Sequence, residues 1–208
     1  YDICACLVGS EMCIRDRDFF DSLFLAFHHV AFQVASIITT TGFATVDFNS
    51  WPTIPKTILV LLMFIGACAG STGGGIKVSR IVLLFRSLTK ELSQSLHPNQ
   101  VRKIHFEGRA VEHVVLRSVN VFIAAYILIF AISVLLIGID NYDLVTNFTA
   151  VAATLNNIGP GLELVGPAQN FGLFSNFSKL VLTFDMLAGR LELFPLLLLF
   201  YRGTWKRF

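Results

Sequence analysis

The most constraining feature of the sequence is an apolar stretch of 22 residues, Ser118 to Ile139, that contains no charged side chain. A helix of this length spans the roughly 30 Å hydrocarbon core of a bilayer. Only 14% of the 208 residues are charged and 54% are hydrophobic, whereas a soluble domain carries roughly 25% charged residues. The sequence therefore predicts an integral membrane protein.

Two further stretches have the length of a membrane span. Thr57 to Ile76 is uncharged, although its second half is rich in glycine, and Lys179 to Tyr201 is apolar but interrupted by Asp185, Arg190 and Glu192. Ionisable groups at membrane depth are costly and usually face a cavity or a partner. Since neither acidic residue shares a helix face with Arg190, we expect Arg190 to reach another segment.

Two other uncharged stretches do not have the pattern of simple spans, because each contains a polar, glycine-containing turn. Ser22–Val46 contains "TTTGF" near its end, and Leu144–Leu162 closes with "NNIGPG". Gly159-Pro160-Gly161 must end the second helix after about a dozen residues, which cover about 18 Å. A short helix followed by a polar, glycine-containing turn is typical of a re-entrant segment, whose irregular backbone must be buried by protein or line water.

The charge distribution predicts the orientation. Acidic residues in the connections at Asp47, Asp140, Asp143 and Glu163 have few basic neighbours. The positive-inside rule therefore places residues 77–117 and the C-terminal end in the cytoplasm, with both polar turns opening from the outer side. Eight basic residues lie in the first of these segments, Lys77, Arg80, Arg86, Lys90, Arg102, Lys103, Arg109 and Arg117.

The two re-entrant stretches belong to an internal repeat. Gly42 aligns with Gly159 at an offset of 117 residues, and the apolar stretches that follow align at an offset of 123, with Lys56 on Lys179. The difference of six residues predicts a longer loop after the second turn. Each unit is expected to contain an outer helix, a re-entrant pore helix, a turn and an inner helix, and functional sites commonly lie at repeat interfaces.

The turns have the composition of a cation site. A pore helix whose C-terminal end points into the membrane directs partial negative charge toward its centre, and a following row of backbone carbonyls replaces the hydration shell of K+. Glycine supplies the backbone angles that such a row needs. We therefore predict K+ ligands at two sets of residues, Thr40, Thr41 and Gly42, and Asn157, Ile158 and Gly159.

The segment "GACAGSTGGGIKV", residues 66–78, resembles a phosphate-binding loop only superficially. That motif requires lysine directly after its last glycine and then Ser or Thr, but Ile76 follows Gly75, and Val78 follows Lys77. We expect no nucleotide here. From the sequence alone, a break in the inner helix beneath the turns and a small-residue packing surface are equally good interpretations.

Four segments together resemble a known family: "TTTGFATVDFNSWP", "GACAGSTGGGIKV", "TLNNIGPG" and "AGRLELFPLLLLF". They are similar to the Trk/Ktr/HKT superfamily, specifically its bacterial TrkH-type potassium uptake subunit, over about residues 18–208. The family chain carries four pore units around one pore, and this sequence matches the last two. The resemblance implies an all-α membrane protein with repeated helix–re-entrant pore helix–helix units of a potassium-channel-like pore, located in the bacterial inner membrane.

The resemblance also implies the roles of individual residues. It favours an intramembrane gate formed by the glycine loop, with the matching arginine, Arg190, in the pore nearby; snorkelling of Arg190 to the headgroups is the alternative. It implies a missing N-terminal half, a homodimer and a cytoplasmic nucleotide-binding regulatory subunit. No cofactor and no nucleic acid are expected, and K+ is the transported ion. The expected gate residues are Gly70, Ser71, Thr72, Gly73, Gly74, Gly75 and Arg190.

The expected organisation has four parts. Residues 1–17 hold three of the four cysteines, lack a clear period and resemble translated adapter sequence, so we expect them to be non-native. Residues 18–95 form the third pore unit, 96–112 a cytoplasmic connection and 113–208 the fourth unit. Cys68 then stands alone, which predicts neither a disulfide framework nor a metal site.

Two other functions are alternatives to a pore. A proton- or sodium-coupled symporter would bind its substrate between broken helices, with Asp185 and Glu192 as its relay candidates. An enzyme is not expected, because the sequence offers no nucleophile–base pair or metal-ligand pattern.

Overall fold

The computed structural model describes residues 23–68, 70–71, 73–96, 104–106, 109–111 and 113–190. The predicted non-native stretch 1–17, the end of the fourth unit beyond Arg190, and Thr72 lie outside the described residues. The helices are α2 (Leu23–Ile38), α3 (Thr53–Ile65), α4 (Val78–Leu96), α5 (His113–Ile137), α6 (Leu144–Leu155) and α7 (Asn176–Arg190). Short 3-10 helices are η1 (Phe48–Ser50), η2 (Gly138–Asp140), η3 (Glu163–Val165) and η4 (Phe171–Leu173).

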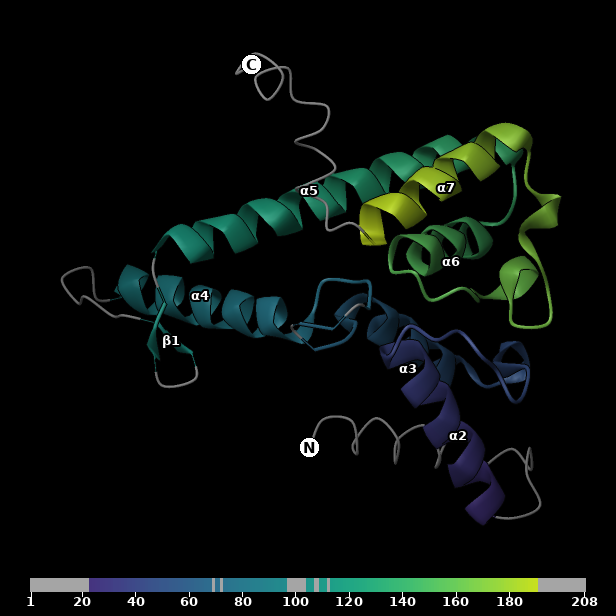
Figure 1. The fold of residues 1–208 in the computed structure, drawn as a ribbon, viewed down its shortest axis with the longest axis horizontal. Helices are drawn as coiled ribbons and strands as arrows, with labels where there is room; N and C mark the ends of the chain where they lie inside the picture. The colour runs from purple at the N-terminus through teal and green to yellow at the C-terminus, as the bar shows by residue number, and fades with distance from the viewer. Residues whose placement is uncertain are drawn as a thin grey trace.

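Helix α5 forms the long axis of the molecule. In Figure 1, α7 lies along its second half, α6 lies next to α7, and α4 lies beneath its first half. Within the described residues, Val114–Asp140 is the one helix long and apolar enough to cross a bilayer by length and composition. The predicted cytoplasmic connection contains a small antiparallel hairpin, β1 (His105–Phe106) with β2 (Arg109–Ala110), in which His105 lies opposite Ala110.

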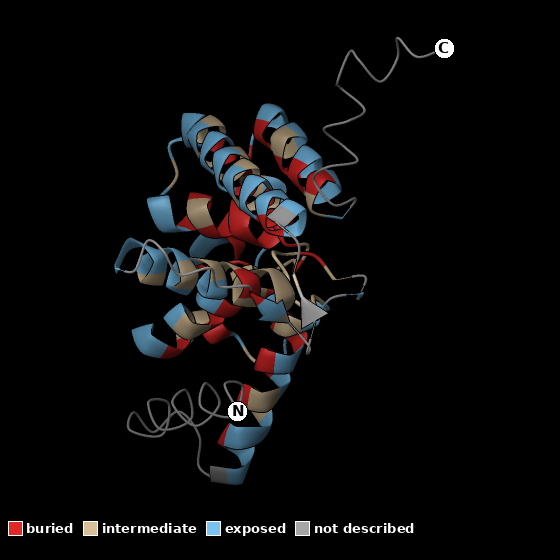
Figure 2. Ribbon diagram, turned by 90° about the vertical axis from the view of Figure 1, so that its left-hand side faces the viewer, coloured by how far each residue is buried: buried red, intermediate tan, exposed pale blue. Residues whose placement is uncertain are grey.

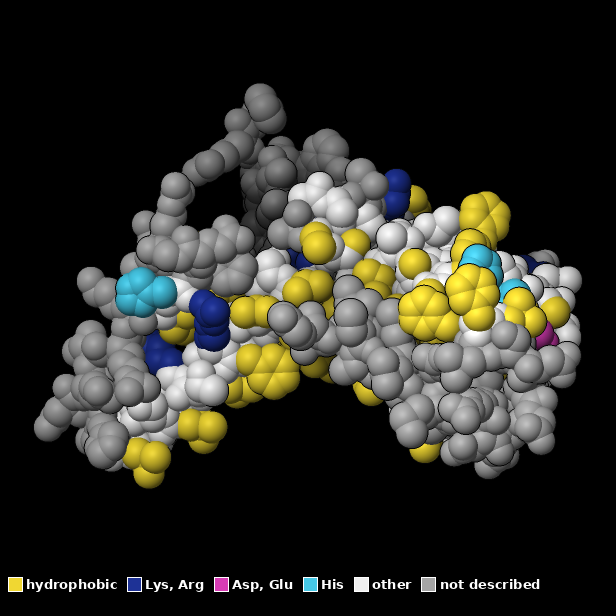
Figure 3. Space-filling view, turned by 90° about the horizontal axis from the view of Figure 1, so that it is seen from below, with side chains coloured by type: hydrophobic (Ala, Val, Ile, Leu, Met, Phe, Trp, Pro, Cys, Tyr) yellow, Lys and Arg dark blue, Asp and Glu magenta, His cyan; other side chains and the backbone are white. Residues whose placement is uncertain are grey.

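Lys, Arg and hydrophobic side chains share one face of the molecule. Figure 3 shows Lys and Arg side chains at the end where α4 and the hairpin lie and also at other places on this face, with hydrophobic side chains along its middle and toward its other end. The connections with Asp140 and Glu163 lie at the far ends of α5 and α6 from α4 and the hairpin.

The apolar stretch Thr57–Ile76 does not form a continuous span. Helix α3 ends at Ile65, because Gly66 adopts a φ of 66° and a ψ of −165° at the C-cap, a conformation that L residues rarely adopt. The equivalent residue in the second unit, Gly189, is the penultimate residue of α7. The two inner helices therefore differ at one aligned position: Gly66 follows the last helical residue of α3, whereas Gly189 is itself helical.

Helix α6 lies at the centre of the structure. Nine of its twelve residues are buried, because α5, α7 and α3 all pack against it, and Figure 2 shows buried residues concentrated in the middle of the molecule. The first pore helix, α2, packs on α3 through Val30, Val34 and Ile37. Its other face exposes several apolar side chains, namely Phe24, Leu25, Phe27 and Phe32.

Hydrogen bonds repeat between the two units at the predicted offset of 123. The amine of Lys56 donates to the Asn49 carbonyl at 3.1 Å, and the amine of Lys179 donates to the Gly172 carbonyl at 3.0 Å. Likewise, the side chains at 47 and 170 cap η1 and η4 by accepting from the backbone amides of residues 49 and 172. The internal repeat is therefore present in the contacts as well as in the sequence.

The six extra residues of the second unit contain η3 and dock on the first unit through Asn49. The Asn49 amide nitrogen donates to the Glu163 carbonyl at 2.8 Å, and its amide oxygen accepts from the Glu163 backbone N–H at 2.8 Å. The Glu163 carboxylate lies 4.0 Å from the Lys56 amine. This contact fastens the loops that precede α3 and α7 in the two units together.

Replacing Asn49 by alanine is expected to lower the free energy of unfolding by about 1–3 kcal/mol, because both hydrogen bonds to Glu163 are lost. Thermal unfolding in detergent would measure the effect. Asn170→Ala is the matched control, since the Asn170 side chain caps its own turn and its loss costs about 1 kcal/mol. Equal midpoints for the two variants would contradict the fastening role.

Candidate functional site

The turns after α2 and α6 have the same backbone conformation. Thr40 and Asn157 both have a φ of 55°, and two residues later Gly42 and Gly159 have φ values of 79° and 109°. These residues are aligned at the offset of 117 found in the sequence. The glycines occupy positions that side-chain-bearing residues adopt only with strain.

The hydrogen bonds of the two turns also correspond. The Thr41 N–H donates to the Ser36 carbonyl at 2.9 Å, and the Ile158 N–H donates to the Ala153 carbonyl, also at 2.9 Å. One residue earlier, the N–H groups of Thr40 and Asn157 donate to the third carbonyl back at 3.1 and 3.0 Å. This pair of bonds is the Schellman motif, in which a left-handed residue ends a helix. Each pore helix therefore ends in the same way, immediately before the polar turn.

The two turns meet. A methyl group placed on Gly42 would overlap the carbonyl oxygen of Ile158, and it would lie 3.4 Å from Cδ of Pro160. The Ile158 carbonyl thus lies between the turns, and only glycine at position 42 allows this approach. The structure brings the two predicted ligand sets, 40–42 and 157–159, side by side.

The glycine loop connects α3 to α4, and backbone hydrogen bonds join its two ends. The Ile76 N–H donates to the Phe64 carbonyl at 3.3 Å, and the Val78 N–H donates to the Ala67 carbonyl at 3.3 Å. A methyl group on Gly66 would lie 2.7 Å from the Gly74 carbonyl oxygen. The loop is therefore compact, and its two ends are held together.

The loop packs against both turns. A methyl group on Gly73 would lie 3.3 Å from Oγ1 of Thr40 in the first turn, and one on Gly74 would overlap the carbonyl oxygen of Asn156 beside the second. Glycine is needed at Gly74 because the Asn156 backbone lies against it. Among the predicted gate residues, Gly73 and Gly74 touch the turns most closely.

The other predicted gate residues lie farther from the turns or support the loop. Gly70 has a φ of 86° in open space, and the Ser71 hydroxyl donates to the Cys68 carbonyl at 2.7 Å. Gly75 lies against Gly66, with the Asn156 carboxamide oxygen 3.4 Å from the position that a methyl group would take.

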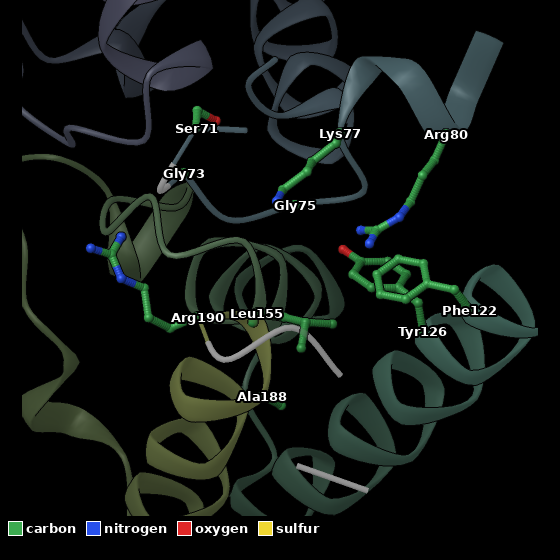
Figure 4. Close-up of a pocket in the computed structure, with 11 residues that line it drawn as sticks. Ser71, Gly73, Gly75, Lys77, Arg80, Phe122, Tyr126, Leu155, Ala188 and Arg190 are labelled. Atoms are coloured by element: carbon green, nitrogen blue, oxygen red, sulfur yellow. The ribbon is translucent and has the colours of Figure 1, made fainter. Parts of the chain in front are cut away.

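A cavity of about 90 Å³ lies beside the loop and contains Arg190 in its lining. Ser71, Gly73 and Gly75 line it from the loop, and Lys77 and Arg80 line it from the start of α4. In Figure 4 the Arg190 side chain extends on the side where Ser71 and Gly73 lie, whereas Arg80, Tyr126 and Phe122 lie together on the other side. A cavity of this volume holds several water molecules, and its cationic lining disfavours a cation inside it.

The side chain of Asp185 contacts α5 and does not line the cavity beside the loop. Asp185 is fully buried, and its Oδ1 accepts a hydrogen bond of 2.7 Å from the Ser133 hydroxyl on α5. Arg190 lines the cavity together with residues of the glycine loop, and its contact with another segment stays a prediction. Glu192, the other acidic neighbour, lies outside the described residues.

Sequence reasoning missed Asn156 and Tyr126. Asn156 is fully buried at the C-cap of α6, and its carboxamide oxygen accepts a hydrogen bond of 2.8 Å from the Tyr126 hydroxyl. A signal was available: Tyr126 and Ser133 are two of the few polar residues in the apolar stretch 118–139. Their spacing of seven places both on one helix face, and both bind residues of the same unit, Asn156 after α6 and Asp185 in α7.

Comparison with known proteins gives concordant relatives. The Trk system potassium uptake protein TrkH of Salmonella typhimurium is 43% identical over 190 residues, which are 91% of this chain and 39% of that protein. The protein of the same name from Escherichia coli K12 is 43% identical over 90% of this chain and 38% of its own length. Trk system potassium uptake protein TrkI of Halomonas elongata is 31% identical over 88% of the chain. The chain thus spans about two fifths of the length of these relatives.

A solved structure gives the same answer for the fold. The crystal structure of the potassium transporter TrkH from Vibrio parahaemolyticus superimposes with a TM-score of 0.88 and 39% sequence identity, covering 98% of this chain and 43% of that one. The predicted fold class, an all-α membrane protein with repeated pore-helix units, is confirmed by this match. The family described as TrkH, cation transport protein, matches residues 22–204. Together with the paired pore-helix turns, this match over most of the sequence shows that the chain belongs to the TrkH family of cation transport proteins.

Proposed function

We propose that this chain supplies the third and fourth pore units of a potassium uptake subunit in the bacterial inner membrane, which it crosses several times. K+ would bind as transported cargo to backbone carbonyls of Thr40–Gly42 and Asn157–Gly159. The observation that carries the proposal is the pair of turns with matching left-handed backbones that meet at Gly42 and the Ile158 carbonyl. Carbonyl ligands suit K+ because they replace its hydration shell without adding fixed negative charge.

The glycine loop is proposed as the gate, formed by residues 70–75 together with Arg190. Its contacts with Thr40 and the Asn156 carbonyl would close the pathway directly beneath the turns. Arg190 beside the loop would raise the energy of a cation in the closed state, since charges interact strongly where water is sparse.

The remaining partners follow from the family resemblance and from the length of the chain. Two pore units cannot close a four-unit ring, and the relatives are more than twice as long as the matched segment. The exposed apolar residues of α2, such as Phe24 and Phe32, suit burial by lipid or by further segments of the same subunit. We further propose a homodimer and a cytoplasmic nucleotide-binding regulatory subunit.

Passive conduction is favoured here over a symporter or an enzyme. A symporter needs an acidic relay that exchanges protons or sodium with its substrate site. Of the two candidates, Glu192 lies outside the described residues, and Asp185 is fully buried with its Oδ1 bound by Ser133 on α5 rather than by either turn. The paired carbonyl turns need no such group, and the related proteins are named for potassium uptake. We therefore propose transport without chemical conversion and without a cofactor.

The test is the reversal potential of the full-length subunit in liposomes. For a K+-selective pore, we expect a shift of about 59 mV for each tenfold K+ gradient, with no shift when the proton or sodium gradient is changed alone. Empty liposomes provide the background. A reversal potential that follows the proton or sodium gradient would contradict the pore and favour the symporter.

A further inference from the structure

Residues on α5 and at the end of α6 form a chain of contacts from the polar turn 157–159 to the N-terminal turn of helix α4. We propose that the Tyr126–Asn156 hydrogen bond is a latch that holds the glycine loop closed, and that Arg80 and Phe122 connect this latch to α4. Tyr126 and Asn156 would be positioning residues, distinct from the turn residues that contact the ion. This inference rests on the proposed function of the loop as a gate.

Asn156 is the centre of the latch because it uses both sides of its carboxamide and also its backbone. Its Oδ1 accepts from the Tyr126 hydroxyl at 2.8 Å, and its Nδ2 donates to the Ala152 carbonyl at 2.8 Å. These two bonds fix the rotation of the side chain and anchor it to α6. Its backbone carbonyl lies against Gly74, and its Oδ1 lies near Gly75. Asn156 therefore touches the glycine loop at two consecutive residues.

The next residue along the chain links the latch to the turn itself. Asn157 has the left-handed conformation that begins the second turn, and its side-chain amide donates to the Met186 carbonyl of α7 at 3.1 Å. Any displacement of Asn156 therefore moves the first ligand residue of the second turn. Asn156 touches the glycine loop and Asn157 begins the second turn. This pair of neighbouring residues therefore couples the position of the loop to the geometry of the turn.

The far side of the latch leads to α4. The Tyr126 ring stacks on Phe122 with centroids 6.4 Å apart and an interplanar angle of 25°. The Arg80 guanidinium lies 4.0 Å from the centroid of the Phe122 ring, a cation–π contact. Figure 4 shows these three side chains gathered at one end of the cavity. Because Arg80 lies in the first turn of α4, directly after the loop, a movement of α4 would act on the loop through its own backbone and through the latch.

The test is Tyr126→Phe in the full-length subunit, which keeps the ring and its stacking but removes the hydroxyl. We expect K+ flux without any regulatory partner to rise about fivefold, the factor that corresponds to the loss of one net hydrogen bond. Hydrogen exchange of the backbone amides of residues 66–75, followed by peptide mass, should accelerate by a similar factor, because exchange reports local opening. Asn156→Leu should act in the same direction, and the double variant should not exceed the larger single effect, because both remove the same contact.

Tyr142→Phe is the matched control. Its hydroxyl donates to the Leu173 carbonyl at 2.8 Å, an equally short bond in the same unit but at the outer loop. It should leave both K+ flux and hydrogen exchange in residues 66–75 at the wild-type level. Arg80→Met, at the partly exposed end of the chain of contacts, should raise both readouts by a smaller factor and does not depend on the folding of a core variant.

The outcomes separate the latch from the pore. Folded Tyr126→Phe with wild-type flux and hydrogen exchange, or equal effects of Tyr126→Phe and Tyr142→Phe, would overturn the latch. Absence of K+ flux in every form, wild type included, would contradict the proposed function. Faster hydrogen exchange of residues 66–75 in Tyr126→Phe alone would still support the latch in that case, because exchange reports opening of the loop without reference to any ion.

Discussion

Replacement of Gly74 by alanine is expected to raise K+ flux in the absence of any regulatory partner by about tenfold. The added methyl group would overlap the carbonyl oxygen of Asn156 and lie 2.7 Å from its carbonyl carbon. Overpacking at such a contact costs about 1–3 kcal/mol, and 1.4 kcal/mol changes an equilibrium tenfold. Because Gly74 has no left-handed backbone, this cost falls mainly on the closed position of the loop.

Isotope flux into liposomes would measure the effect, with Gly138→Ala as the control. Gly138 lies in η2 at the outer end of α5, and a methyl group there has nothing within 4 Å. It should therefore conduct like the wild type. If a folded Gly74→Ala subunit showed the same K+ flux as the wild type, the loop would not be the gate.

Replacement of Gly42 by alanine is expected to lower the K+/Na+ permeability ratio by at least tenfold. Two costs combine: the φ of 79° is unfavourable for alanine by about 1–2 kcal/mol, and the methyl group would overlap the Ile158 carbonyl oxygen. The second effect displaces a proposed ligand of the opposite turn. One substitution thus disturbs two ligand sets.

Bi-ionic reversal potentials would measure the ratio, and Gly159→Ala is the informative comparison. Gly159 has a φ of 109°, but a methyl group there would enter open space, so only the backbone strain remains. We expect a smaller fall in the ratio for Gly159→Ala. An unchanged ratio in Gly42→Ala would exclude the carbonyls of these turns as the selective site.

The elements that follow from local patterns were predicted from the sequence. The dozen-residue helix before Gly159 is α6, Leu144–Leu155, because the consecutive glycine and proline residues at 159–161 cannot continue a helix. The repeat was visible because both units keep the same glycine and lysine positions. The structure adds that their turns share backbone angles and hydrogen bonds.

Contacts between distant side chains and backbone could not be predicted. Asn49 and Glu163 are 114 residues apart, and nothing in the local sequence of either requires the other. The break at Gly66 and the continuity at Gly189 also escape a local pattern, because both positions are glycine. Packing decides the difference: a methyl group on Gly189 would overlap the Leu155 carbonyl, so that α7 needs its glycine for close approach to α6.

The hydrogen bonds that join the two ends of the glycine loop have a consequence for how fast the gate opens and closes. Since backbone hydrogen bonds join Ile76 to Phe64 and Val78 to Ala67, the loop can swing aside while the ends of α3 and α4 stay together. Loop motions take nanoseconds to microseconds, whereas collective helix movements take microseconds to milliseconds. We therefore expect brief, frequent openings whose rate is insensitive to bilayer thickness, because no helix has to change its tilt.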